Sequence, residues 1–262
     1  MEEHKMVTPK GDGKPFMTLE HVSLRLRSGI VFENTHWEIL HGQQWVVLGP
    51  NGSGKSILVK AILGEVPVVS GQILYHFLDE MPIKDAFEAS DRLRDLVTCV
   101  SSDSGKGAPG QGSGFYQVRW NSFLNTDSPL VSETLFQQHA GTAYPFRFAR
   151  EPANPLPSAA TVKEVIGLLG IEALLNKKLS VLSDGEVRRV MIAEALLRGP
   201  RLLVLENPFT GLDAAYKANL RRIIGKVMKR DTVVILVTSR AEEIPDSATH
   251  VLRVDHNRVV AQ

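Results

Sequence analysis

The run Gly-Pro-Asn-Gly-Ser-Gly-Lys-Ser at residues 49–56 constrains the fold of this chain more than any other feature. It follows four apolar residues, 45–48, and leads into the helix-like stretch 56–63, which ends before Gly64. A short continuous apolar run is typical of a strand buried on both faces of a parallel sheet. The spacing G-x-x-x-x-G-K-S between a strand and a helix is that of a phosphate-binding loop. The sequence therefore predicts a strand, a phosphate-binding loop and a helix over residues 45–63.

The composition of this loop suits a nucleoside triphosphate with its magnesium ion. Glycines allow successive backbone N–H groups to turn toward phosphate oxygens, and the helix that follows adds the positive end of its dipole. The Lys55 ammonium can reach the β- and γ-phosphates, and the Ser56 hydroxyl can ligate Mg²⁺. We therefore predict that ATP and Mg²⁺ bind here, with contacts from Gly49, Pro50, Asn51, Gly52, Ser53, Gly54, Lys55, Ser56 and Ile57.

Strand-like and helix-like segments alternate along the rest of the chain, which indicates an α/β fold around a parallel sheet. Strands are predicted at 17–26, 35–40, 96–100, 202–205 and 233–237, and a terminal hairpin at 251–254 and 258–260. Helices are predicted at 85–93, 161–169, 171–175, 187–197 and 214–228. The glycine-rich stretch 104–114 is expected to be a mobile surface loop, and the proline-rich stretch 144–157 interrupts the pattern.

Composition argues against several other classes of protein. The 262 residues include 30 Lys and Arg against 29 Asp and Glu, so the basic excess typical of a nucleic-acid-binding protein is missing. The single cysteine, Cys99, cannot form an internal disulfide and is expected in the core of a protein from a reducing compartment. No apolar run approaches the roughly 20 residues of a membrane span, and no secretory signal is evident. We expect a cytoplasmic protein whose role at the inner face of a membrane, if any, needs a separate subunit.

A second group of motifs lies downstream of the loop. Leu-Ser-Asp-Gly-Glu at 182–186 has the spacing of a helix capping box, and the strand-like run 202–205 leads into Glu-Asn-Pro at 206–208. Gly-Leu-Asp follows at 211–213. In this order the motifs resemble the signature, Walker B strand and D-loop of the ABC (ATP-binding cassette) ATPase superfamily. Segments 115–122, 208–213 and 242–245 resemble the tandem ABC proteins of the ModF/PhrA type, of which this chain would be the N-terminal half.

This resemblance implies the architecture of the chain. It implies a P-loop α/β fold with a RecA-like core, an antiparallel β subdomain and a helical subdomain inserted across about 105–179. Residues 1–15 would form a flexible lead-in, and 16–262 a single ATP-binding domain.

The resemblance also implies a second ABC domain, in the same longer chain or as a homodimer. The two would pair head to tail, with ATP between the P-loop of one and the signature of the other. Ser183 and the Gly185 backbone would then contact the γ-phosphate held by the partner. Asp184, Glu186 and Asp213 would share this interface. A capped helix with no such role is the alternative interpretation of the signature.

Three positions depart from the family's pattern, one at the metal and two at the step of water attack. Glu206 stands where the family has the aspartate that holds Mg²⁺, Asn207 replaces the glutamate that polarises water, and Ser239 replaces the switch histidine. An amide cannot accept a proton as a carboxylate does, and loss of a general base typically slows a reaction about 10²–10⁴-fold. We therefore predict a half-site that is degenerate for hydrolysis. Harmless drift in an active ATPase, and a substitution introduced to trap ATP, are the alternatives.

Further departures concern the base and the Q-loop. Leu26 falls where the family has an adenine-stacking aromatic residue, so it can pack on the base but offers no π face. Ser-Ser-Asp at 101–103 stands where the Q-loop glutamine is expected, and Gln111 or Gln117 could substitute. Arg188 and Arg189 are expected on a solvated helix face.

Three functions are consistent with these observations. The first is the ATP-binding half of a tandem ABC protein. The second is the ATPase subunit of a transporter, which would co-purify with a membrane partner. The third is a non-catalytic ATP sensor, which would dimerise with ATP and not hydrolyse it. No nucleic-acid partner is predicted.

Overall fold

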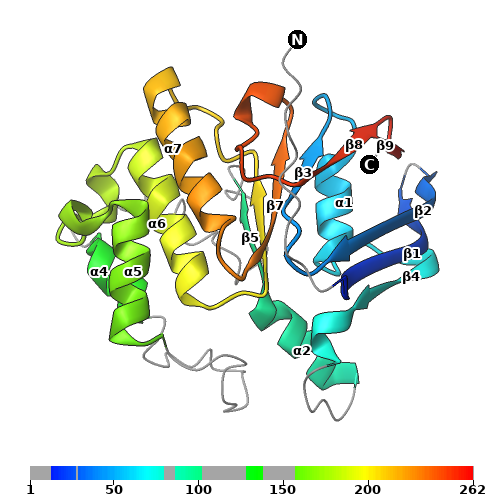
Figure 1. Ribbon diagram of the computed structural model, residues 1–262, viewed down its shortest axis with the longest axis horizontal. Coiled ribbons are helices and arrows are strands. Elements are labelled where there is room, and N and C mark those ends of the chain that lie inside the picture. Colours follow the sequence, from blue (N-terminus) through cyan, green and yellow to red (C-terminus); the bar gives the residue numbers. More distant parts are fainter. Residues whose placement is uncertain (1–12, 28, 80–85, 102–127, 138–156, 262) are drawn as a thin grey trace.

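The computed structural model describes residues 13–27, 29–79, 86–101, 128–137 and 157–261 (Figure 1). Its main strands and helices follow in the order β1 (Pro15–Leu26), β2 (Gly29–Leu40), β3 (Trp45–Leu48), α1 (Lys55–Ile62), β4 (Val68–Tyr75), α2 (Ala86–Leu96), β5 (Val97–Ser101), α4 (Val131–Gln137), α5 (Ala159–Leu169), α6 (Asp184–Leu197), β6 (Leu202–Glu206), α7 (Ala214–Val227), β7 (Val233–Thr238), β8 (His250–Asp255) and β9 (Arg258–Ala261).

A six-stranded sheet of order β5-β6-β7-β3-β8-β9 forms the centre of the molecule. Neighbouring strands from β5 to β8 are parallel, and β9 pairs antiparallel with β8 to form the predicted hairpin. This confirms the α/β architecture. Because parallel strands end at a common edge, the segments that follow β3, β6 and β7 meet at one edge of the sheet.

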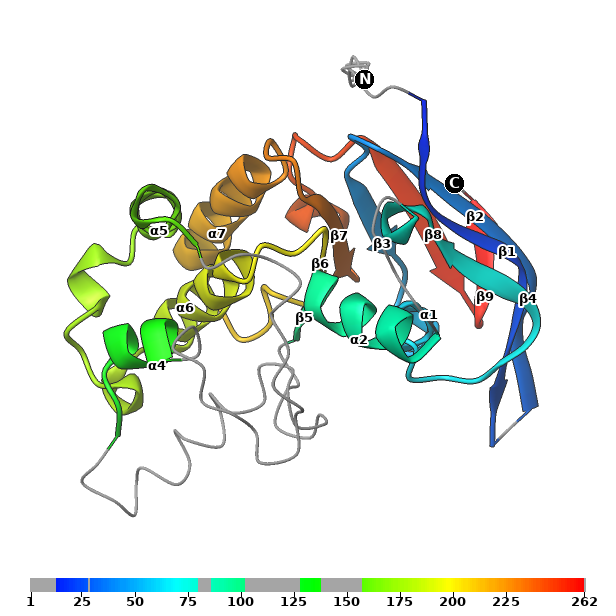
Figure 2. The ribbon, with the colours of Figure 1, turned by 90° about the horizontal axis from the view of Figure 1, so that it is seen from below.

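The sheet separates two apolar cores, because successive residues on a strand face opposite sides. Val46 and Leu203 belong to the core that α6 and α7 cover, whereas Val47 and Val204 belong to the core shared with α1 and the antiparallel sheet. Figure 2 shows helices α5, α6 and α7 gathered on one side and β1, β2 and β4 on the other. Burial of both faces explains why the parallel strands are continuous apolar runs.

The second sheet is antiparallel, with the order β2-β1-β4. The predicted strands 17–26 and 35–40 are confirmed, but β2 begins earlier, at Gly29. Strand β4 was not predicted, because its first five residues are exposed and lack an apolar face. Within it, Gly71 has a φ of 73°, and a Cβ there would lie 2.2 Å from the Glu20 carbonyl oxygen. This edge strand is therefore held by close backbone contact with β1. A contact between distant segments leaves no pattern in the local sequence.

The predicted helices are confirmed with small shifts at their ends. One prediction was wrong in type: residues 171–175 form a short 3-10 turn, Glu172–Leu174, where a helix was expected. None of the helices in the described ranges combines the length and the apolar character needed to cross a bilayer. The stretch 104–114, nearly all of 144–157 and the lead-in before residue 13 lie outside the described residues. The predicted helical subdomain is therefore described through α4, α5 and the turns that follow α5.

Candidate functional site

The predicted phosphate loop connects the inner strand β3 to α1. A Cβ on Gly49 would lie 2.1 Å from the Val254 carbonyl oxygen, so no larger residue fits against β8. Gly52 and Gly54 have φ values of 80° and 102°, in the left-handed region that glycine adopts without strain. Each of these three glycines is therefore required by the backbone, and the strand–loop–helix prediction is confirmed.

Lys55 lies inside the loop with 6% of its surface exposed. Its Nζ donates to the carbonyl oxygens of Gly49 and Pro50, at 2.7 and 2.8 Å. Desolvation lowers the pKa of this ammonium, and the nearby Glu206 carboxylate opposes that shift. The Lys55 ammonium thus donates its hydrogen bonds to carbonyl oxygens. An anion such as phosphate is a stronger acceptor and could replace them.

The ends of β6 and β7 bring the other predicted positions to this edge. Glu206 lies opposite Val237 in the parallel ladder, and β7 pairs in turn with β3. Asn207 adopts a left-handed φ of 47°, and its N–H donates to the Val237 carbonyl at 2.9 Å. Ser239 follows β7 and is exposed, as is Ser56 at the start of α1. The Ser56 hydroxyl and the Glu206 carboxylate are oxygen donors of the kind that Mg²⁺ prefers, so the residues present fit the ion.

The turn after β7 is held by residues that the sequence analysis did not single out. Thr238, 1% exposed, donates its hydroxyl to Glu243 Oε2 and accepts the Arg240 N–H at 3.3 Å. Glu243 Oε1 lies 3.4 Å from Lys217 Nζ on α7. These contacts fix the backbone on both sides of Ser239. A threonine that ends an otherwise apolar strand is the one signal in the sequence.

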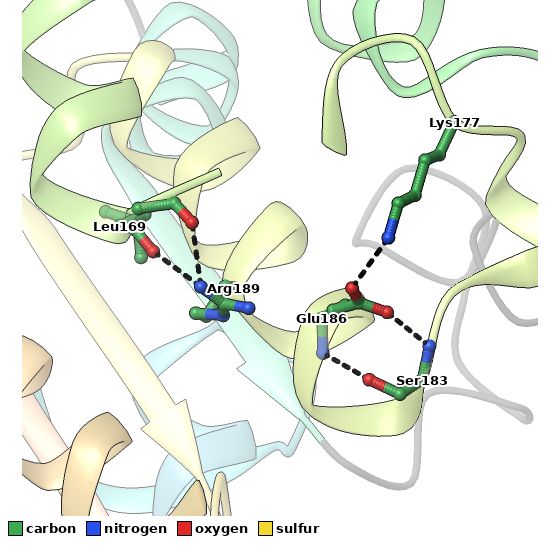
Figure 3. Close-up of polar contacts among 6 residues, drawn as sticks. Leu169, Lys177, Ser183, Glu186 and Arg189 are labelled. Carbon is green, nitrogen blue, oxygen red and sulfur yellow. Dashed lines mark hydrogen bonds and ion pairs between the residues drawn. The ribbon is translucent and has the colours of Figure 1, made fainter. Parts of the chain in front are cut away.

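The signature segment forms the predicted capping box at the start of α6 (Figure 3). Ser183 Oγ accepts the Glu186 N–H at 3.3 Å, and Glu186 Oε2 accepts the Ser183 N–H at 2.8 Å. Lys177 Nζ lies 3.1 Å from Glu186 Oε1. Desolvation alone raises the pKa of Glu186, but the hydrogen bonds from Ser183 and Lys177 outweigh it, so the pKa is lowered overall. Ser183 and Asp184 remain exposed at the helix N-terminus.

The prediction that Arg188 and Arg189 form a solvated face was wrong. Arg188 is 3% exposed. Arg189 Nη1 donates to the carbonyl oxygens of Leu169 and Gly170, at 3.3 and 2.8 Å, and so caps the end of α5 (Figure 3). The reason is the position of α6, which packs against both α5 and the sheet and therefore buries residues on most of its circumference.

Leu26, the predicted base-binding residue, is half-buried at the end of β1, opposite Gly29 of β2. Near the loop, the buried ring of Phe32, which is 1% exposed, packs with its Cε2 3.1 Å from the ideal Cβ position of Gly54. Phe32 belongs to the core shared with α1 and supports the loop by packing. Ser101 ends β5, and the other Q-loop candidates lie outside the described residues.

The helices that follow the loop and the signature lie on opposite faces of the central sheet. Helix α1 contributes to the core shared with the antiparallel sheet, and α6 contributes to the opposite core. Asp213 begins α7 as its N-cap and accepts the Tyr216 N–H at 2.9 Å. The structure thus brings Lys55 and Glu206 to the same edge of the sheet, whereas the helix that begins at the signature packs in the opposite core.

Comparisons with known proteins agree with this geometry. The family described as ABC transporter matches residues 32–210. An uncharacterized ABC transporter ATP-binding protein of Schizosaccharomyces pombe is 26% identical over 234 residues, which are 88% of this chain and 44% of that protein. The ABC transporter ATP-binding protein ModF of Escherichia coli is 27% identical over 205 residues, which are 78% of this chain and 35% of ModF. The chain thus spans less than half the length of these two relatives.

A solved structure shows the same fold. CbiO1 from Clostridium perfringens, part of the ABC transporter complex CbiONQ, superposes with a TM-score of 0.71 and 22% identity. The match covers 95% of this chain and 88% of that one. At this identity the likeness concerns the fold.

Proposed function

This chain belongs to the ABC transporter family of ATP-binding domains, and we propose that it binds Mg-ATP through residues 49–56 and pairs head to tail with a second ABC domain. The observation that carries the proposal is Lys55, a buried cation held by two loop carbonyls beside the Glu206 carboxylate. Lys55 would bind the β- and γ-phosphates in place of the loop carbonyls, and Ser56 and Glu206 would hold Mg²⁺. Because ATP is intracellular, we place this activity on the cytoplasmic side.

In the proposed pair, each signature serves the nucleotide of the other domain. Ser183 and the backbone of Gly185 stand at the N-terminus of α6, where the helix dipole favours an anion. Asp184, Glu186 and Asp213 lie at or near this surface. The partner is a second ABC domain, either in the same full-length chain or in a second copy.

We further propose that hydrolysis at this P-loop is slow. Asn207 and Ser239 stand at the edge of the sheet beside Glu206, where a general base and a switch histidine would serve water attack. Neither an amide nor a hydroxyl takes up a proton at neutral pH. The site therefore retains nucleotide and promotes pairing more than it turns ATP over.

Three measurements test the proposal. A fluorescent ATP analogue with Mg²⁺ should bind the wild-type chain and bind Lys55→Ala at least about tenfold more weakly, because the cation is lost. Light scattering should show Mg-ATP-dependent pairing with the wild type and none with Lys55→Ala. Steady-state turnover should rise at least about tenfold in an Asn207→Glu, Ser239→His variant, because a general base is restored.

Asn207→Gln is the matched control for turnover, since it lengthens the side chain without adding a base. Asn207→Glu and Asn207→Gln each place a longer side chain on a left-handed backbone and reduce the stability of the fold by about 1–2 kcal/mol. Unfolding midpoints are therefore compared in parallel. Wild-type turnover equal to that of the restored variant would contradict the slow site. Absence of nucleotide binding by the wild type would contradict the whole proposal.

A second candidate function, the ATPase subunit of a transporter, is favoured by the match of residues 32–210 to the family described as ABC transporter. In this role the chain would associate with a membrane subunit on the cytoplasmic face. Affinity purification of the chain from detergent-solubilised membranes tests it. Recovery of a stoichiometric membrane protein supports the role, and recovery of a second ABC domain alone supports the first proposal. Pairing with ATP and no turnover in any assembly would identify an ATP sensor.

A further inference from the structure

The turn between β8 and β9 contacts the phosphate loop through one residue. Asn257 N–H donates to the Ser53 carbonyl oxygen at 2.8 Å, and the Asn257 carbonyl oxygen accepts the Phe32 N–H at 2.9 Å. A single residue thus joins the loop, the terminal hairpin and strand β2. The sequence predicts this hairpin and indicates no further role for Asn257.

The backbone of this turn favours an asparagine. His256 and Asn257 have φ values of 45° and 58°, the two left-handed positions of a tight hairpin turn. Asp255 Oδ1 supports the turn by accepting the His256 N–H at 3.0 Å. Asparagine, aspartate and glycine all adopt this conformation readily. Substitutions among them therefore change the side chain and preserve the backbone.

The side chain of Asn257 fills the space beside Gly54. A Cβ on Gly54 would lie 2.4 Å from Asn257 Oδ1 and 3.1 Å from its Cα. Gly54 is the N-cap of α1, and no side chain caps this helix end by a hydrogen bond. The amide oxygen therefore stands next to the positive end of the helix dipole, where the proposed function places phosphate.

Backbone hydrogen bonding explains why such a residue is needed. A loop whose N–H groups converge on an anion leaves carbonyl oxygens that need other donors. Lys55 Nζ serves the carbonyls of Gly49 and Pro50, and Asn257 N–H serves that of Ser53. We propose that Asn257 is a positioning residue for the nucleotide: it fixes the Ser53 peptide and fills the space beside Gly54 with a neutral group. This inference rests on the proposed binding of Mg-ATP.

The decisive variant is Asn257→Asp, which keeps the shape and adds one negative charge beside the phosphate position. We expect about tenfold weaker binding of the fluorescent ATP analogue, because like charges repel at short range. The unfolding midpoint without nucleotide should stay the same or rise, since a carboxylate is favourable at a helix N-terminus. A residue with a purely structural role would not move these two quantities in opposite directions.

His256→Asp is the matched control, because it also introduces a carboxylate into the same turn. Its side chain is 92% exposed. We expect its affinity to stay within about threefold of the wild type, and Asn257→Gly to recover most of the affinity that Asn257→Asp loses, because its backbone N–H remains. Equal losses in Asn257→Asp and His256→Asp, or unchanged affinity in Asn257→Asp, would overturn the inference. Failure of the wild type to bind would instead overturn the proposed function.

Discussion

Gly185 and Tyr216 approach so closely that a Cβ on Gly185 would lie 2.5 Å from Tyr216 Cδ1. Gly185 lies in the first turn of α6, and Tyr216, 38% exposed, in the first turn of α7. The absence of a side chain at Gly185 therefore allows the signature helix to meet the helix that begins at Asp213.

Gly185→Ala should destabilise the fold by about 1–3 kcal/mol, because its methyl group overlaps the Tyr216 ring. In a Tyr216→Ala background the same substitution should be neutral or stabilising by up to about 1 kcal/mol, since alanine favours a helix more than glycine. Urea unfolding of the four proteins measures both values. An equal cost in the two backgrounds would show that the ring is not the obstacle.

Thr238→Val should destabilise the chain by about 1–3 kcal/mol, because the buried Glu243 carboxylate loses its hydroxyl donor while its contact with Lys217 remains. Thr238→Ser retains the hydroxyl and is the control, with a smaller loss from the missing methyl group. Chemical denaturation distinguishes them. If valine and serine cost the same, the hydroxyl contributes nothing.

Glu186→Gln should reduce the dependence of stability on acid pH. Because the pKa of Glu186 is lowered in the folded chain, its carboxylate stabilises the fold above the unfolded pKa of about 4.3. That contribution is lost as the pH falls through the folded pKa. The free energy of unfolding, measured by urea denaturation between about pH 5 and pH 3, should therefore change less with pH in the variant than in the wild type. An identical dependence of unfolding free energy on pH in the two proteins would contradict the prediction.

His250 should make the fold less stable below about pH 6.5. Its ring stacks on Trp45 at 4.8 Å, and its Nδ1 lies 2.7 Å from Thr249 Oγ1. Desolvation lowers the pKa of His250, so the unfolded chain takes up the proton first and stability falls as the pH drops through this range. His250→Gln should flatten the profile of unfolding free energy against pH between about pH 7.5 and pH 5.5, and an unchanged profile would contradict the prediction.

The central part of the fold could be predicted because its requirements are local. The apolar run before Gly49, the glycines and Lys55 specify a strand, a turn and a helix within a few residues. The Ser183–Glu186 capping box is equally local. The parallel order of the strands followed from their alternation with helices.

Other features depend on contacts between distant segments, and local patterns do not encode those. Strand β4 exists through its pairing with β1, although Val68 and Val69 are exposed. Arg188 is buried because α6 lies between α5 and the sheet. The bond from Asn257 to Ser53 joins residues about two hundred positions apart in the sequence. The roles of Asn207 and Ser239 in hydrolysis stay predictions.

If the two domains pair head to tail, the placement of α1 and α6 on opposite faces of the central sheet makes ATP retention depend on the concentration of the protein. In the proposed head-to-tail pair, Lys55 of one domain and Ser183 of the other serve the same nucleotide. The amount of ATP retained by such a pair then depends on the concentration of the protein as well as on that of the nucleotide. Dilution weakens the apparent affinity, and a tethered second domain makes it independent of dilution. Cellular abundance would thereby set how much ATP this chain retains.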